Sequence, residues 1–144
     1  MKIYFACAIA GGRDHAYVYP QLITHLKNHG EVLTEIFSAD DIFDLDNKID
    51  DSEIFKRDMQ WLKQAHVMVA ETSTSSLGVG YEIAKAESLD KWILSLFENQ
   101  DHKKLSAIIS GNDYHKLMVR RYNTIEEAYI YINEFFSHLK HEDN

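Results

Sequence analysis

Two carboxylates are the residues most suited to chemistry, Asp58 and Glu82. Asp58 falls in the middle of the apolar stripe of a predicted helix over residues 51–65. A carboxylate is costly to bury there unless it is paired or functional. The structural alternative is a buried ion pair with Arg57 or Lys63, or a hydrogen bond to the backbone. The sequence alone leaves both interpretations open.

Glu82 ends the segment S-S-L-G-V-G-Y-E, which follows one predicted strand and opens a predicted helix. Ser75 and Ser76 are natural helix N-caps, and such a helix start can bind a phosphate. Gly78 and Gly80 remove side chains where a phosphate or sugar could approach, although close helix–strand packing is an alternative reason for them. The segment has neither the Walker nor the dinucleotide-binding spacing. On its own, Glu82 is better explained as a surface glutamate than as a site residue.

The two acids are more informative as a pair. Both belong to elements that are predicted to border the same edge of one sheet. Two carboxylates that flank a sugar are what cleavage of a glycosidic bond requires, because one attacks the anomeric carbon and the other transfers protons. The pair therefore predicts chemistry at a sugar.

The elements that would position these acids alternate along the chain. Alternating strands and helices predict an α/β fold, a flavodoxin- or Rossmann-like sandwich in one domain over residues 1–144, with a five-stranded parallel sheet and helices on both faces. The predicted strands are 2–7, 31–35, 66–71, 92–97 and 117–122, and the predicted helices are 14–29, 51–65, 77–89, 102–110 and 124–140. The acidic residues 37–50 between them are expected to form a long loop, either a mobile lid or a solvated segment.

Composition limits the classes of partner. The 144 residues carry a net charge of −8, which argues against binding a nucleic-acid polymer. No uncharged apolar run is long enough to span a membrane. The single cysteine, Cys7, is expected to be a buried apolar side chain in a reducing compartment, cytoplasmic or nuclear. No cofactor is expected, and His138 and His141 are interpreted as solvated side chains instead of metal ligands.

Several strings in this sequence resemble those of a known family. They are Y-F-x-x-x-I-x-G-G-R-D from Tyr4, L-T-E from Leu33, D-M-Q-W-L from Asp58, S-L-G-V-G-Y-E from Ser76 and L-S-A-I-I-S-G from Leu105. In this order and spacing they resemble the Rcl-type 2'-deoxynucleoside 5'-monophosphate N-glycosidases, which are relatives of the nucleoside 2-deoxyribosyltransferases. The resemblance covers nearly the whole chain.

The resemblance implies a role for each matching residue. Glu82 would be the nucleophile that forms a deoxyribosyl-enzyme intermediate, Asp58 would be the acid/base, and Tyr4 would hydrogen-bond near both the nucleophile and the sugar. Ser76 would bind the 5'-phosphate, and Ser106 would reach the phosphate in a neighbouring subunit's site, which makes the active unit a homodimer. The remaining pocket residues implied are Ile9, Ala10, Gly11, Gly12, Arg13, Gly78, Gly80 and Ile108.

The first loop departs from the family pattern, which commonly reads S-I-R-G-G-R. Here Ala8 and Ala10 replace a serine and an arginine that would face the phosphate, and only Arg13 remains as a cation. Ile108 also replaces a frequent methionine, which is a near-neutral change for packing. Three functions stay open on this sequence: a deoxynucleoside monophosphate hydrolase, a 2'-deoxyribosyltransferase that exchanges bases on free nucleosides, and a non-catalytic nucleotide-binding module.

Overall fold

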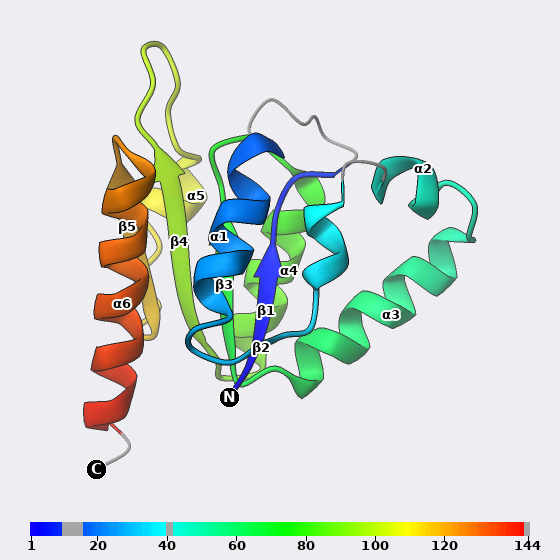
Figure 1. Ribbon diagram of the computed structural model, residues 1–144, viewed down its shortest axis with the longest axis horizontal. Coiled ribbons are helices and arrows are strands. Elements are labelled where there is room, and N and C mark those ends of the chain that lie inside the picture. Colours follow the sequence, from blue (N-terminus) through cyan, green and yellow to red (C-terminus); the bar gives the residue numbers. More distant parts are fainter. Residues whose placement is uncertain (10–15, 40–41, 143–144) are drawn as a thin grey trace.

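Five short strands form one sheet in the order β2-β1-β3-β4-β5 (Figure 1). They are β1 (Lys2–Ala6), β2 (Glu31–Val32), β3 (Val67–Glu71), β4 (Trp92–Glu98) and β5 (Leu117–Tyr122). All four strand pairings are parallel, which confirms the predicted sheet. This computed structural model describes residues 1–9, 16–39 and 42–142, except for the side chains at positions 38 and 43. The strand order reverses between β1 and β3, the point at which such sheets bind ligands.

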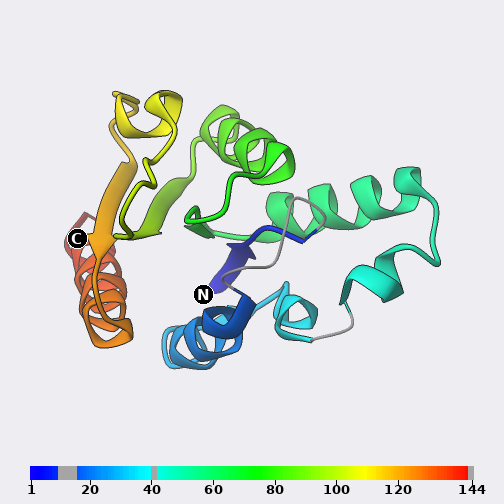
Figure 2. The same cartoon turned by 90° about the horizontal axis from the view of Figure 1, so that it is seen from above.

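Helices cover both faces of the sheet (Figure 2). Side chains alternate along a strand. In β1, Phe5 packs into the core beneath α1 (Tyr19–Leu26) and α6 (Ile125–Glu142), whereas Tyr4 packs into the core beneath α3 (Asp51–Gln64) and α4 (Leu77–Ser88). Tyr4 therefore lies on the same face of the sheet as α3 and α4, the two helices that carry the predicted catalytic acids. None of the helices in the described part of the chain is long and apolar enough to cross a membrane.

The second strand is shorter than predicted, because the side chain of Thr34 ends it. Thr34 Oγ1 accepts a hydrogen bond from Phe5 N at 2.9 Å and donates one to Phe5 O at 2.8 Å. The side chain thus occupies the positions that a continuing strand would use on β1. The chain then turns into the short helix η2 (Glu35–Ser38). The prediction of a strand over residues 31–35 is wrong beyond Val32.

The predicted acidic loop over residues 37–50 is also wrong in part. It contains a helical turn, α2 (Ile42–Asp46), which is anchored because Ile42 is fully buried. These residues therefore do not form a purely solvated segment. Residues 40–41 lie outside the described part of the chain.

The other boundaries differ in smaller ways. The first helix comprises η1 (Ala16–Val18) followed by α1, which places Pro20 in a first turn, where its missing N–H costs nothing. The predicted helix over residues 102–110 forms only as α5 (Ala107–Ser110).

Candidate active site

A cavity of about 460 Å³ opens beyond the carboxyl ends of β1 and β3. It brings together segments that lie far apart in the sequence: the residues after β1, η2, the end of α2, one face of α3 and the first turns of α4. Its lining residues are Cys7, Ile9, Phe37, Asp46, Asn47, Asp51, Ile54, Asp58, Ser76, Leu77, Gly78, Val79 and Glu82. Both predicted catalytic carboxylates therefore face one chamber.

Glu82 lies one turn inside α4, on the same side as Gly78. A Cβ atom at Gly78 would lie 3.8 Å from Glu82 Oε1 and 3.8 Å from Ser76 Oγ, so the glycine leaves room beside the carboxylate. Glu82 Oε2 is shielded from solvent and has no hydrogen-bond partner among the described residues. Buried polar atoms nearly always have a partner, so an unpartnered one beside a cavity indicates a role in binding or chemistry.

Tyr4 lies beneath the cavity with its side chain fully buried. Its hydroxyl has no hydrogen-bond partner within the described part of the chain. Burial, together with the charges of Glu82 and Asp58, raises the pKa of Tyr4 far above its ordinary value. Tyr4 therefore remains a neutral O–H donor. The hydroxyl does not meet hydrogen-bond geometry with Glu82, but it is near enough to lower the pKa of that carboxyl.

The pKa of Glu82 is raised to about 7, chiefly by burial; the Tyr4 hydroxyl opposes this rise and the charge of Asp58 contributes to it. Burial also raises the pKa of Asp58, while the neighbouring guanidinium of Arg57 opposes that rise and Asp46 adds to it. The charge of Asp58 is thus one of the causes of the raised pKa of Glu82. Carboxyls with pKa values displaced toward neutrality are suited to nucleophilic and proton-transfer roles.

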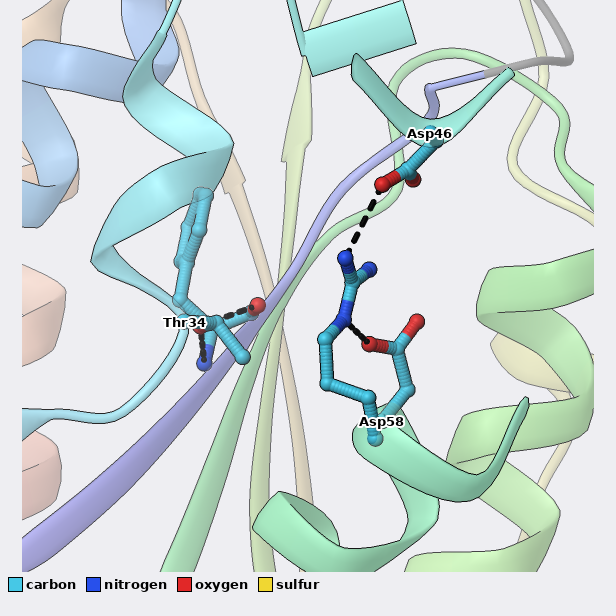
Figure 3. A network of polar contacts seen from close by, with 5 residues as sticks. Thr34, Asp46 and Asp58 are labelled. Atoms are coloured by element: carbon cyan, nitrogen blue, oxygen red, sulfur yellow. Dashed lines mark hydrogen bonds and ion pairs between the residues drawn. The ribbon is translucent and has the colours of Figure 1, made fainter. Parts of the chain in front are cut away.

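Asp58 is held by an ion pair (Figure 3). Arg57 Nε donates to Asp58 Oδ1 at 2.8 Å, and Arg57 Nη1 donates to Asp46 Oδ1 at 2.9 Å. The sequence offered an ion pair with Arg57 as the alternative to a functional Asp58. The structure contains that pair and also places Asp58 in the cavity wall, so the two interpretations do not exclude each other.

Ser76 caps α4, because its Oγ accepts a hydrogen bond from Val79 N at 3.2 Å. This makes Ser76, and not Ser75, the N-cap of the helix. The capping residue and the first turn line the cavity that contains Glu82. The unpaired N–H groups of a helix start are thereby brought next to the buried carboxylates.

The remaining predicted residues fall into two groups. Gly80, Ser106 and Ile108 line a second cavity of about 510 Å³, which shares Ser76, Leu77 and Val79 with the first but does not contain Glu82. Within one chain, these three residues are therefore not brought to the carboxylate pair. Ala10, Gly11, Gly12 and Arg13 lie outside the described residues, whereas Ala8 is fully buried.

Phe37, Asp46 and Asn47 are among the cavity residues that the sequence analysis missed. They belong to the stretch that was interpreted as a loop, so only the apolar Phe37 and Ile42 within an acidic run could have indicated an ordered wall. In the described part of the chain, no three His, Cys, Asp or Glu side chains converge in a way that could hold a metal ion.

A fully buried carboxylate lies at the carboxyl end of the central strand, β3. Glu71 ends β3 and is fully buried, where it accepts hydrogen bonds from Ser73 N at 2.6 Å and from the Tyr122 hydroxyl at 2.5 Å. It lines neither cavity described above. Glu71 ties the end of β3 to β5 and to the loop that leads into α4.

Comparison with known proteins shows the family of this chain and agrees with its fold. The sequence profile of the nucleoside 2-deoxyribosyltransferase family matches residues 3–130, and the chain belongs to this family. A 5-hydroxymethyl-dUMP N-hydrolase from Danio rerio is 39% identical over 96% of this chain and 98% of its own. A protein from Trichoplax adhaerens described as a putative 2'-deoxynucleoside 5'-phosphate N-hydrolase 1 is 40% identical over 80% of this chain and 85% of its own.

A solved structure supports the fold alone. The CMP N-glycosidase of Clostridium botulinum superimposes with a TM-score of 0.66, covering 94% of this chain and 99% of its own, at 19% sequence identity. The predicted flavodoxin- or Rossmann-like sandwich is confirmed by this match and by the sheet order.

Proposed function

We propose that this protein hydrolyses the N-glycosidic bond of 2'-deoxynucleoside 5'-monophosphates, releasing the free base and 2-deoxyribose 5-phosphate. The observation that carries the proposal is the pair of partly buried carboxylates, Glu82 and Asp58, which line one cavity beside the neutral hydroxyl of Tyr4. The names of the relatives support the same reaction class, since they are described as N-hydrolases of deoxynucleoside phosphates.

In the first step, a carboxylate oxygen of Glu82 forms a bond to C1' of the deoxyribose while the C1'–N bond breaks. The electron pair of that bond passes to the base, and Asp58 supplies the proton that the departing nitrogen requires. In the second step, the oxygen of a water molecule attacks C1' while that water gives a proton to the Asp58 carboxylate. The bond between C1' and the Glu82 oxygen breaks, which frees the Glu82 carboxylate. The Tyr4 hydroxyl donates toward Glu82, and so restrains its basicity and stabilises it as the leaving carboxylate.

The start of α4 supplies a site for the 5'-phosphate. Its first-turn N–H groups and the positive end of its dipole favour an anion, and Ser76 holds this turn in place. The net charge of −8 on the chain does not prevent phosphate binding here, because backbone N–H groups supply the hydrogen-bond donors.

We further propose that the active unit is a homodimer in which Ser106 serves the partner's site. Ser106 is exposed and lines a cavity separate from the one that contains Glu82. Leu77 is 97% exposed and Ile108 is 80% exposed, and both border that second cavity. Adjacent large apolar side chains with such exposure favour burial against another protein surface.

The experiment that tests the reaction follows release of free base from dGMP, 5-hydroxymethyl-dUMP, CMP and deoxyguanosine, each with and without added adenine. We expect hydrolysis of the deoxynucleoside monophosphates and no dependence on adenine. Turnover of deoxyguanosine alone, with exchange of guanine for adenine, would instead identify a 2'-deoxyribosyltransferase, the alternative that the relatives' names do not favour.

The covalent step is tested separately by mass spectrometry of the denatured protein after rapid quenching. We expect an added deoxyribose 5-phosphate on the peptide that contains Glu82, and no addition in Glu82→Ala. Hydrolysis by the wild type with no trapped sugar at any quench time would indicate direct attack by water.

A further inference from the structure

The guanidinium of Arg57 is held by contacts from its own helix, α3, and from the segments η2 and α2. Consecutive residues on a helix do not face each other, yet Arg57 Nε donates to Asp58 Oδ1 at 2.8 Å. The guanidinium carbon lies 5.1 Å from the ring centroid of Trp61 and 5.9 Å from that of Phe37. Arg57 Nη1 reaches Asp46 Oδ1 at 2.9 Å. Contacts from η2, α2 and α3 therefore hold this side chain across the helix.

The arrangement places one cation between two acids of the cavity wall. Asp46 and Asp58 both line the cavity, whereas Arg57 stands behind them. Their side chains are only 13% and 15% exposed, and that of Arg57 is 22% exposed, so solvent screens these charges weakly. Arg57 is thus the group that compensates the buried charge of Asp58.

We propose that Arg57 is a positioning residue that fixes the orientation and the charge state of Asp58. Through its ion pair with Asp46, Arg57 also couples the orientation and charge state of Asp58 to the docking of α2. This inference rests on the proposed function, because it concerns the acid/base of that reaction. Arg57 touches no reacting atom and keeps all of its protons.

The physical basis is the strength of a charge-assisted hydrogen bond. When Asp58 gives its proton to the departing base, it becomes a carboxylate and its bond with Arg57 becomes stronger. The interaction is therefore greater after proton transfer than before it, which favours the transfer. Because Arg57 Nε bonds to Oδ1, the proton is carried on Oδ2. The planar guanidinium contacts Asp58 and Asp46 at once, which a lysine ammonium could not do in the same geometry.

The test compares pH profiles of kcat/KM for Arg57→Gln, Arg57→Lys and Asp46→Asn. Arg57 lowers the pKa of Asp58, so Arg57→Gln should move the profile to higher pH and lower kcat about 10- to 100-fold, with a smaller change in KM. Asp46 raises the pKa of Asp58, so Asp46→Asn should move the profile to lower pH. Arg57→Lys should restore the position of the profile, because the charge returns, but only part of kcat.

Lys56→Gln is the matched control, since it removes the same charge from the neighbouring, exposed position of α3. We expect its profile and kcat to equal those of the wild type. An Arg57→Gln profile that keeps the wild-type position would overturn the inference, whether or not kcat falls, because a merely structural side chain would affect folding or kcat without moving the profile.

A second measurement separates this inference from the proposed function. Carboxyl carbon NMR gives the titration of Asp58 directly in the folded protein, without substrate. We expect a higher midpoint in Arg57→Gln than in the wild type and a lower midpoint in Asp46→Asn. Equal midpoints in all three proteins refute the role of Arg57 even if the enzyme is active, whereas absence of nucleotide hydrolysis by the wild type refutes the proposed reaction alone.

Discussion

At the scale of single residues, the site depends on where charge is left without compensation. Glu82 Oε2 and the Tyr4 hydroxyl are buried without partners among the described residues, whereas Asp58 has an arginine. Two acids of similar type thus acquire different environments, which is how a protein assigns different roles to a nucleophile and an acid/base. The cost is a buried carboxylate that is difficult to ionise.

The first prediction concerns the pH dependence of catalysis. A nucleophilic carboxyl must be ionised, and burial raises the pKa of Glu82 to about 7. Asp58 must be protonated to act as the acid, so we expect a bell-shaped dependence of kcat/KM on pH for a deoxynucleoside monophosphate, with one limb centred near pH 7, because kcat/KM reports groups of the free enzyme. A profile with no limb near pH 7 would contradict this environment for Glu82.

The second prediction concerns stability and has a defined sign. Because the pKa of Glu82 is higher in the folded protein than in the unfolded chain, ionisation of Glu82 opposes folding above its ordinary pKa. Glu82→Gln should therefore raise Tm at pH 8, by about 2–4 °C for each kcal/mol gained, and change it little at pH 5. Calorimetry of both proteins at the two pH values provides the measurement. An equal effect at both pH values would show that charge is not responsible.

At the scale of elements, α4 contributes more to the site than any other segment. Its cap, its first turn and its second turn supply Ser76, Gly78 and Glu82 to one side of the cavity. Helical spacing aligns Gly78 with Glu82, and the missing side chain of the glycine becomes space beside the carboxylate. The element therefore acts as a preformed half of the site.

The third prediction tests this use of glycine. Gly78→Ala should stabilise the protein by up to about 1 kcal/mol through helix propensity, since the new methyl group meets only atoms at 3.8 Å. It should also lower kcat/KM by about 10- to 200-fold, the range for one misplaced methyl group in a pocket. Gly80→Ala is the comparison, because it gains the same propensity while its Cβ meets nothing within 4 Å. Equal losses of activity in both variants would argue against a special role for position 78.

At the scale of the whole molecule, the chain presents two cavities on either side of the first turn of α4. The carboxylates line one of them, and Ser106 and Ile108 line the other. If two chains pair across this face, the proposed phosphate contact of Ser106 would be made in the partner's site and not beside the carboxylates of its own chain. The dimer remains a proposal, and it makes a quantitative prediction.

The fourth prediction is complementation between two impaired variants. In an equal mixture of Glu82→Gln and Ser106→Ala that has exchanged subunits, half of the dimers are mixed and each contains one intact site. Activity should recover to roughly a quarter of the wild-type value for the same total protein. Light scattering checks that both variants are dimers. A mixture with only the average activity of its components would exclude a site shared between chains.

Much of the fold followed from local patterns. The apolar runs of β1, β3, β4 and β5 and the periodicity of α3, α4 and α6 predicted these elements to within two residues. Prediction failed at residues 33–39 and 42–46, where local preference is weak and tertiary contacts decide. Thr34 stops β2 by bonding to β1, and Ile42 anchors α2 in the core.

The candidate site, like the fold, could be predicted only in part from the sequence. The sequence by itself determined that Asp58 lies on an apolar helical face and that Gly78, Glu82 and a capping serine share one helix, because spacings of three and four residues set faces within a helix. Only the tertiary structure decided that Glu82 and Tyr4 are buried together without partners, and that Arg57 joins Asp58 to Asp46. Burial and ion pairing depend on segments many residues apart, and periodicity contains no information about which of those segments meet.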